Sequence, residues 1–180
     1  LFPLNFDERH RVNMNLDYRF GAGKFYNGPN LFGSDILANA GLSLQAIAVS
    51  GRPYTATITP LELGGAQTAG SINGSRKPWN YTINLRVDKV VQVSKGLSMN
   101  IYCRVSNLLN QQNILNVYSS TGSPKDDGFL ASSNGQDKLL NIVNSNRMVD
   151  AYLASYQWAL LNPGLFSLPR RIFAGVIMDF

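Results

Sequence analysis

The chain has 180 residues and contains only one cysteine, Cys103, and one histidine, His10. A single cysteine excludes an internal disulfide and a thiolate metal cluster, so the chain is not a disulfide-stapled secreted fold. Charged residues make up only 15% of the sequence, whereas typical soluble domains contain about 25%. No apolar run approaches the ~20 residues that a membrane-spanning helix requires. The chain therefore carries less charge than a soluble domain of its size usually does, and it shows no helical membrane anchor.

Several functional classes lack the residues that they need. The net charge is +5, but the cations are dispersed, and the chain has no basic stripe interleaved with aromatics as in RNA-binding sheets. A single histidine and the absence of a nucleophile-elbow sequence disfavour a Ser-His-Asp triad. No glycine pattern follows a strand and opens a helix, so a phosphate-binding loop is not supported. We expect neither nucleic-acid binding nor enzymatic activity, with no catalytic residues and no cofactor.

Alternation of apolar and polar residues is the main structural signal. It predicts five β-strands at about 9–20, 40–51, 79–92, 97–110 and 170–180, because successive side chains of a strand point to opposite faces. Strands of globular proteins are usually about five or six residues long, whereas a tilted transmembrane strand needs about nine to eleven. The pattern therefore predicts an all-β fold, a transmembrane antiparallel β-barrel.

The connections between the strands are unequal in length. A tight turn is expected at Ser94-Lys95-Gly96, and long loops are expected at about 52–78 and 111–169. Outer-membrane barrels have short periplasmic turns and long extracellular loops, so we expect the two long loops to be extracellular. The segment 21–39 is then an unusually long periplasmic turn. The segment 146–161 is expected to form either a helix that ends at Asn162-Pro163-Gly164 or an irregular aromatic loop.

The alternation assigns a face of the sheet to each strand residue. The positions expected to face lipid include Leu16, Leu85, Ile101 and Val176, and Cys103 belongs to the same apolar set. The positions expected to face the lumen or its rim are Asn15, Arg86, Arg104 and Asp179. Aromatic residues near the strand ends are expected to form interfacial girdles; they are Tyr18, Phe20, Trp79, Tyr81 and Phe180.

The acidic residues offer weak candidates for metal sites. In a strand, Asp7 and Glu8 point to opposite faces, so the segment 7–10 is interpreted as a solvated strand start rather than a metal cluster with His10. Asp126 and Asp127 have carboxylates suited to calcium, but Pro124-Lys125-Asp126-Asp127-Gly128 is equally typical of a turn. No other metal site is expected.

The end of the sequence resembles the signal that the bacterial barrel-assembly machinery reads on a last strand. The residues concerned are Gly175, Val176, Met178 and Phe180. An ordinary strand that happens to end in an aromatic residue is the alternative.

Stretches spread over nearly the whole chain resemble TonB-dependent outer-membrane receptors, specifically the Oar-like branch with a carboxypeptidase-regulatory-like N-terminal domain. They are residues 6–13, 50–55, 105–110, 117–130 and 162–180. The resemblance implies that residues 1–180 form the last five strands of a 22-stranded barrel, with the plug and N-terminal domains absent from this chain. It also implies a Gram-negative outer-membrane location, assembly by the barrel-assembly machinery, contact with the lipid bilayer, and coupling to TonB through the absent N-terminal part.

Three functions are compatible with the sequence. The first is transport of a large or scarce solute across the outer membrane by a TonB-dependent-receptor-like barrel. The second is a non-transporting structural barrel subunit of an outer-membrane assembly or secretion complex. The third is a soluble β-sandwich binding module, whose strands are expected to be shorter.

Overall fold

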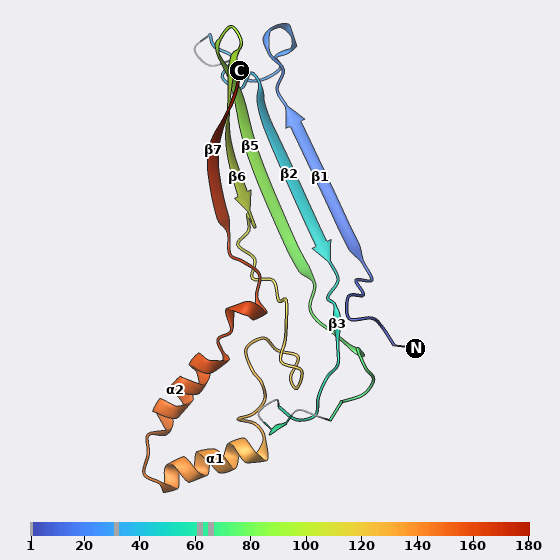
Figure 1. The fold of residues 1–180 in the computed structure, drawn as a ribbon, viewed down its shortest axis with the longest axis vertical. Helices are drawn as coiled ribbons and strands as arrows, with labels where there is room; N and C mark the ends of the chain where they lie inside the picture. The colour runs from blue at the N-terminus through green and yellow to red at the C-terminus, as the bar shows by residue number, and fades with distance from the viewer. Residues whose placement is uncertain (1, 31–32, 61–62, 65–66) are drawn as a thin grey trace. The chain divides into compact units, whose positions relative to one another are not determined.

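A computed structural model describes residues 2–30, 33–60, 63–64 and 67–180 of the chain (Figure 1). The chain divides into two compact units. The sheet unit comprises Arg11–Ala48, Tyr81–Gln111 and Leu168–Phe180, and the loop unit comprises Leu1–His10, Val49–Asn80 and Gln112–Ser167.

The sheet unit is built on five antiparallel strands in the order β1-β2-β5-β6-β7 (Figure 1). Their bounds are β1 Arg11–Arg19, β2 Ala40–Val49, β5 Asn80–Ser94, β6 Leu97–Ser106 and β7 Arg171–Asp179. Each strand lies beside the next of the five along the chain, as in an up-and-down meander. The predicted strands are confirmed as an antiparallel sheet, but over the described residues the sheet is open, with β1 and β7 at its edges.

Four predicted strand ends differ from the structure by two or more residues. Arg9 and His10 precede β1 instead of starting it, β2 stops at Val49 instead of continuing to residue 51, and β5 continues to Ser94 instead of stopping at residue 92. The strand predicted to reach residue 110 ends at Ser106 because Asn107 has φ 56°. This left-handed conformation is one that asparagine tolerates better than most residues, and it turns the backbone out of the extended path.

The register of the last three strands places apolar residues on one face and mainly polar residues on the other. Ile101 pairs with Val176, whereas Arg104 pairs with both Arg86 and Phe173. Residues directly opposite in an antiparallel pair share a face, so these two rows lie on opposite sides of the sheet. Lys89 is an exception on the apolar face, where its amine donates to the Ile36 carbonyl.

Two connections join strands at one end of the sheet. The predicted tight turn between β5 and β6 is confirmed, with Gly96 at φ 93°. The connection from β1 to β2 contains a short 3₁₀ helix, η1 (Gly23–Phe25), and its Tyr26 hydroxyl donates to the Pro29 carbonyl over 2.7 Å. The described residues of this connection therefore form more than a simple turn.

The described residues of the loop unit include short strands and helices. Strands β3 (Pro53–Tyr54) and β4 (Ser75–Arg76) pair with each other, and α1 (Ser133–Asn144), α2 (Val149–Leu160) and the 3₁₀ helix η3 (Pro163–Leu165) follow. Of the two alternatives for residues 146–161, the helix is confirmed as α2. Helix α1 was not predicted, although the Ser132 hydroxyl accepts a hydrogen bond from the Gly135 N–H, as an N-cap residue does. Over the described ranges, neither the length nor the hydropathy of any helix suffices to cross a membrane.

Candidate functional site

The apolar face of the sheet is exposed along its length. Ile101 is 44% exposed and Val176 is 53% exposed, although both belong to strands paired in the sheet. Other large exposed residues of this face are Val12, Met14, Leu16, Tyr18, Leu42, Tyr81, Val87, Ile172 and Met178. Burying such side chains is the main favourable contribution to folding, so this face is suited to an apolar environment.

The apolar face also contains a hollow of about 460 Å³. Small side chains of β2, Ala46 and Ala48, lie between larger side chains of the neighbouring strands, including Met14 and Tyr81. The size difference between these neighbours accounts for the hollow.

The opposite face has a hollow of about 370 Å³, to which Leu16, Leu44 and Leu85 contribute together with polar residues. The Ser43 hydroxyl donates to the Asp17 carboxylate, which places β1 and β2 side chains together on this face. The Asn84 amide donates to Gln45 Oε1 over 3.1 Å and continues the row to β5. The polar side chains that line the hollow are Asn15, Asp17, Ser43, Gln45, Asn84, Arg86 and Arg104.

A charged network centred on Asp88 lies on the same polar face. Asp88 is 2% exposed, and its Oδ2 accepts a hydrogen bond from Arg19 Nη1 over 3.2 Å. Arg86 Nε lies 3.5 Å from the other oxygen, Oδ1. The Arg19–Asp88 pair crosses β2 at Gly41, where a Cβ would be 3.0 Å from Arg19 Nη1 and 3.3 Å from Asp88 Oδ1. Glycine at position 41 thus leaves room for an ion pair between two strands that are not neighbours.

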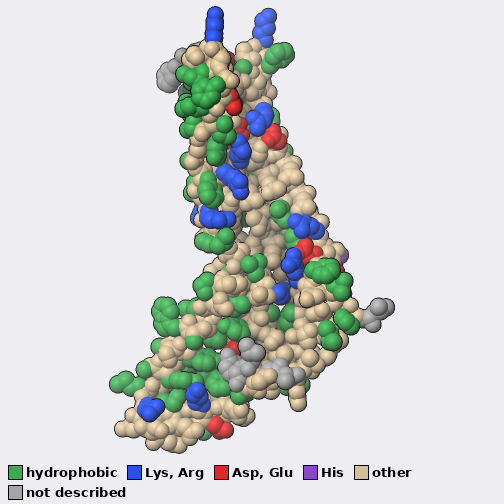
Figure 2. Space-filling view, in the orientation of Figure 1, with side chains coloured by type: hydrophobic (Ala, Val, Ile, Leu, Met, Phe, Trp, Pro, Cys, Tyr) green, Lys and Arg blue, Asp and Glu red, His purple; other side chains and the backbone are tan. Residues whose placement is uncertain are grey.

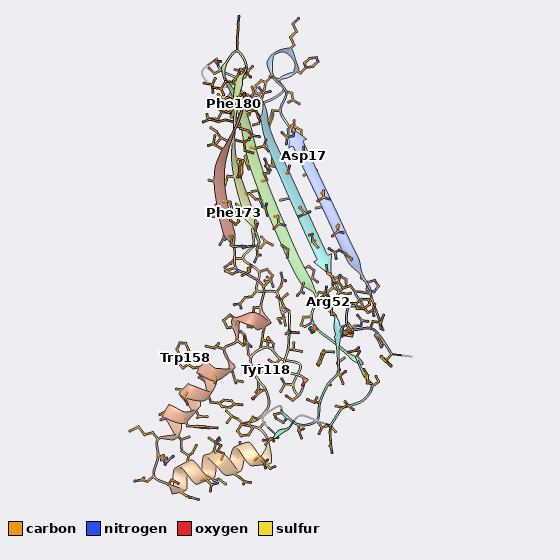
Figure 3. All side chains as sticks on the ribbon, viewed as in Figure 1. Asp17, Arg52, Tyr118, Trp158, Phe173 and Phe180 are labelled. Carbon is orange, nitrogen blue, oxygen red and sulfur yellow. The ribbon has the colours of Figure 1, made fainter. Side chains whose placement is uncertain are left out.

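Aromatic rings extend this network toward β7. The Arg86 guanidinium lies 5.1 Å from the centre of the Tyr102 ring, and Arg104 lies 6.0 Å from the Phe173 ring. Figure 2 shows Lys and Arg side chains gathered over the strands of the sheet, and Figure 3 shows Asp17 and Phe173 on the two edge strands. The polar face is therefore linked from β1 to β7 by ion pairs and cation–ring contacts.

The structure brings the predicted face residues together in the expected sets. Leu85, Ile101 and Val176 belong to the apolar rows, and Leu16 alternates with Asp17, which faces the polar side. Arg86, Arg104 and Asp179 belong to the polar rows, and Asn15 lines the polar hollow. Whether these faces meet lipid and lumen stays a prediction.

The residues of the predicted assembly signal divide between the two faces. Val176 and Met178 pair with Ile101 and Met99 on the apolar face, and Phe180, which follows β7, is 97% exposed (Figure 3). Gly175 lies on the polar face, opposite Tyr102. Recognition of these residues by an assembly machinery stays a prediction.

The two weak calcium candidates form turns within the loop unit. Asp126 Oδ1 accepts from the Gly128 N–H over 2.8 Å, and Asp127 Oδ1 accepts from the Phe129 N–H over 3.0 Å and from the Tyr156 hydroxyl. Asp127 is 1% exposed, so it serves as a buried anchor for α2. Within the part of the chain that the structure describes, no three His, Cys, Asp or Glu residues are grouped so as to hold a metal ion.

The acidic segment before β1 makes ion pairs that the sequence interpretation missed. Asp7 pairs with Arg76, and Glu8 pairs with Arg52 over 2.9 Å. The His10 ring is parallel to the Trp79 ring at 6.1 Å. Residues 7–10 are not in a strand, so the assignment of Asp7 and Glu8 to opposite faces of one was wrong. They attach the start of the chain to the β3–β4 region of the loop unit.

Two further residues were missed by sequence reasoning. The buried Asn107 side chain donates to the Gln111 and Leu168 carbonyls over 3.0 and 3.1 Å, which connects the end of β6 to the segment before β7. For Asn107, the only sequence signal was that the alternating run ends at Ser106-Asn107.

The second residue is Lys77 of the loop unit. Its Nζ donates to the Leu115 carbonyl over 2.8 Å. Burial, assisted by the nearby Arg52 charge, lowers the pKa of Lys77.

Comparison with known proteins finds no matching family model, no matching curated protein and no matching solved structure. The resemblance to TonB-dependent receptors therefore rests on the residues quoted above.

Proposed function

We propose that this chain forms part of the wall of a bacterial outer-membrane β-barrel of the TonB-dependent-receptor type, Oar-like branch, which transports a large or scarce solute. The observation that carries the proposal is the two-sided sheet, with an exposed apolar face on one side and a polar, charged face on the other. Outer-membrane barrels have this arrangement, with the apolar face toward lipid and the polar face toward the lumen.

The exposed apolar face supports membrane insertion over a soluble fold. Monomeric soluble proteins rarely expose contiguous apolar patches of more than a few hundred Å², and a β-sandwich covers such a face with a second sheet. The only other sheet among the described residues is the β3–β4 pair, whose strands have two residues each. A pair of this size does not supply the second layer of a sandwich.

The open edges of the sheet support a barrel with further strands. In hydrocarbon each unpaired backbone group costs several kcal/mol, so a sheet spans a bilayer only when it is closed. Strands β1 and β7 are at the edges of the described sheet. In the proposed barrel, strands outside these 180 residues pair with both edges.

Accessibility of introduced cysteines tests the proposed orientation. In full-length protein carrying Cys103→Ser, the variants Leu85→Cys and Ile101→Cys are expected to resist a membrane-impermeant thiol reagent in outer-membrane vesicles. Asn84→Cys and Asn100→Cys, one residue away on the polar face, are expected to react, and Ser132→Cys in the loop unit serves as a labelling control. Strong labelling at 85 and 101 with protection at 84 and 100 would contradict the proposal.

A separate measurement tests the transport half of the proposal. The full-length protein is expected to bind the purified periplasmic domain of TonB, because a TonB-dependent transporter must couple to it. Absence of binding, together with the expected cysteine pattern, would favour a structural barrel without transport.

A further inference from the structure

Two arginines face each other on the polar side of the sheet. Arg86 of β5 and Arg104 of β6 are directly opposite in the register. Like charges in this position destabilise an antiparallel pair. A negative charge close to both guanidinium groups would offset this repulsion.

The nearby carboxylates neutralise only part of this pair. Asp88 is hydrogen-bonded to Arg19, and its remaining oxygen is 3.5 Å from Arg86 Nε, which is buried without a hydrogen-bond partner. Among the residues that the structure describes, Arg104 has no carboxylate within ion-pair distance, and its guanidinium lies 6.0 Å from the centre of the Phe173 ring. One positive charge of the pair is thus left without an acidic partner in this part of the protein.

Hydrogen-bonding groups surround the two arginines. The side chains of Asn15, Ser43, Gln45 and Asn84 line the same hollow of about 370 Å³, and so does Asp17, whose carboxylate accepts from the Ser43 hydroxyl. Amide groups orient a polar ligand, and guanidinium groups bind carboxylate or phosphate through two parallel hydrogen bonds. Two arginines and one carboxylate line the hollow, so its lining keeps the net positive charge that a small anion requires.

We propose that this hollow binds the carboxylate or phosphate group of an anionic solute, held jointly by Arg86 and Arg104. The proposal deepens the proposed function and rests on it in one respect, namely that the polar face lines the path of the solute. An acidic segment from the rest of the protein is the competing occupant, and the experiment below separates it from a solute.

Thermal unfolding of the purified full-length protein, with inorganic phosphate as the probe, tests the site. At equal ionic strength, sodium phosphate is expected to raise the unfolding temperature of the wild type above its value in sodium chloride. Arg104→Gln is expected to abolish this difference and to weaken phosphate binding at least tenfold. Arg104→Lys is expected to retain part of the effect, because it keeps the charge but loses the planar fork. Lys95→Gln, in the β5–β6 turn, is the control and is expected to behave as the wild type.

The unfolding temperature without phosphate separates the two occupants. For a solute site, Arg104→Gln in chloride is expected to unfold at the wild-type temperature or above it, because the repulsion is removed. If the wild type does not respond to phosphate and Arg104→Gln unfolds at a lower temperature, an acidic segment fills the hollow and the proposal is overturned. An equal phosphate response in wild type and Arg104→Gln also overturns it. Heat-modifiable migration of the same samples reports barrel formation independently, so a failed anion site is distinguished from a failed barrel assignment.

Discussion

The phenol ring of Tyr102 on β6 lies directly over Gly175 on β7, so that a Cβ at position 175 would be 2.6 Å from the phenol oxygen. The same ring has the Arg86 guanidinium 5.1 Å from its centre. Because Gly175 has no side chain, the Tyr102 ring can lie against β7 on the polar face of the sheet. In that position the ring contacts Arg86 of β5.

Gly175→Ala is expected to move the Tyr102 ring away from its present position. The added methyl group costs about 1–3 kcal/mol through overpacking, and the contact between Tyr102 and Arg86 is lost. The measurement is the denaturant midpoint of the full-length protein in detergent, followed by gel migration. In a Tyr102→Leu background the same change is expected to cost much less. An equal cost in both backgrounds would mean that Tyr102 does not restrict position 175.

Asp88→Asn is expected to destabilise the full-length protein by about 1.5–3 kcal/mol, because hydrogen bonds to charged groups contribute about that much. Asp88 is the buried carboxylate between Arg19 and Arg86, and the amide does not balance their charge. Asp17→Asn is the matched control. Asp17 also pairs with Arg19, but more than half of its side chain is exposed, so a loss below about 1 kcal/mol is expected. Equal losses in the two variants would show that burial of Asp88 adds nothing.

Lys77 gives the loop unit a pH dependence of known sign. Its pKa is lowered in the folded protein by burial and secondarily by Arg52. As pH rises from this lowered pKa to the ordinary value near 10.5, the folded state loses the proton before the unfolded state does, so stability increases. The check is NMR titration of ¹³C-methylated lysines in the full-length protein, with Lys77→Arg to assign the signal. Arg52→Gln removes the smaller of the two causes, so the titration midpoint of Lys77 is expected to rise toward its ordinary value. It is expected to stay below that value, because burial remains.

The alternation of apolar and polar residues made the strands predictable. Odd and even positions of a strand point to opposite faces of the sheet, and here one face is apolar and the other polar. Leu85, Ile101 and Val176 were assigned to one face from sequence spacing, and the register confirms that they share it. The ends were less predictable, since β6 stops where the left-handed conformation and hydrogen bonds of Asn107 redirect the chain. That conformation depends on the Leu168 carbonyl, 61 residues away.

The charged network was not predictable for a related reason. The sequence marks Asp88 and Arg19 as polar-face residues, but their pairing depends on strand order and on the missing side chain of Gly41 between them. Helix α1 was missed because its apolar residues are few, and its start depends on the Ser132 cap. Partners distant in sequence decide these features, and local patterns do not reveal them.

Asp127→Ala is expected to loosen the helical part of the loop unit. The Asp127 carboxylate accepts from the Phe129 N–H and from the Tyr156 hydroxyl of α2, and its loss leaves a buried donor without a partner, which costs about 1–3 kcal/mol. Limited proteolysis of the full-length protein is expected to cut faster between residues 131 and 161. Asp126→Ala, which removes a more exposed turn acceptor, is the control and is expected to have a smaller effect. If added calcium protected the wild type and EDTA reversed this, the turn interpretation of these two aspartates would be wrong.

Ile101→Arg is expected to impair folding far more than Asn100→Arg, although the two residues are neighbours on β6. Ile101 lies on the apolar face opposite Val176, whereas Asn100 lies on the polar face opposite Ile177. An arginine directed toward the middle of a bilayer costs about 2–4 kcal/mol, and one directed toward a lumen costs little. In a soluble protein with an uncovered sheet, Asn100→Arg is expected to impair folding more than Ile101→Arg. The reason is that Ile101 is already 44% exposed, whereas Asn100 Oδ1 is buried. The fraction of heat-modifiable full-length protein in outer membranes measures the difference, with Ile101→Val as the conservative control. Greater damage from Asn100→Arg would mean that the apolar face meets water rather than lipid.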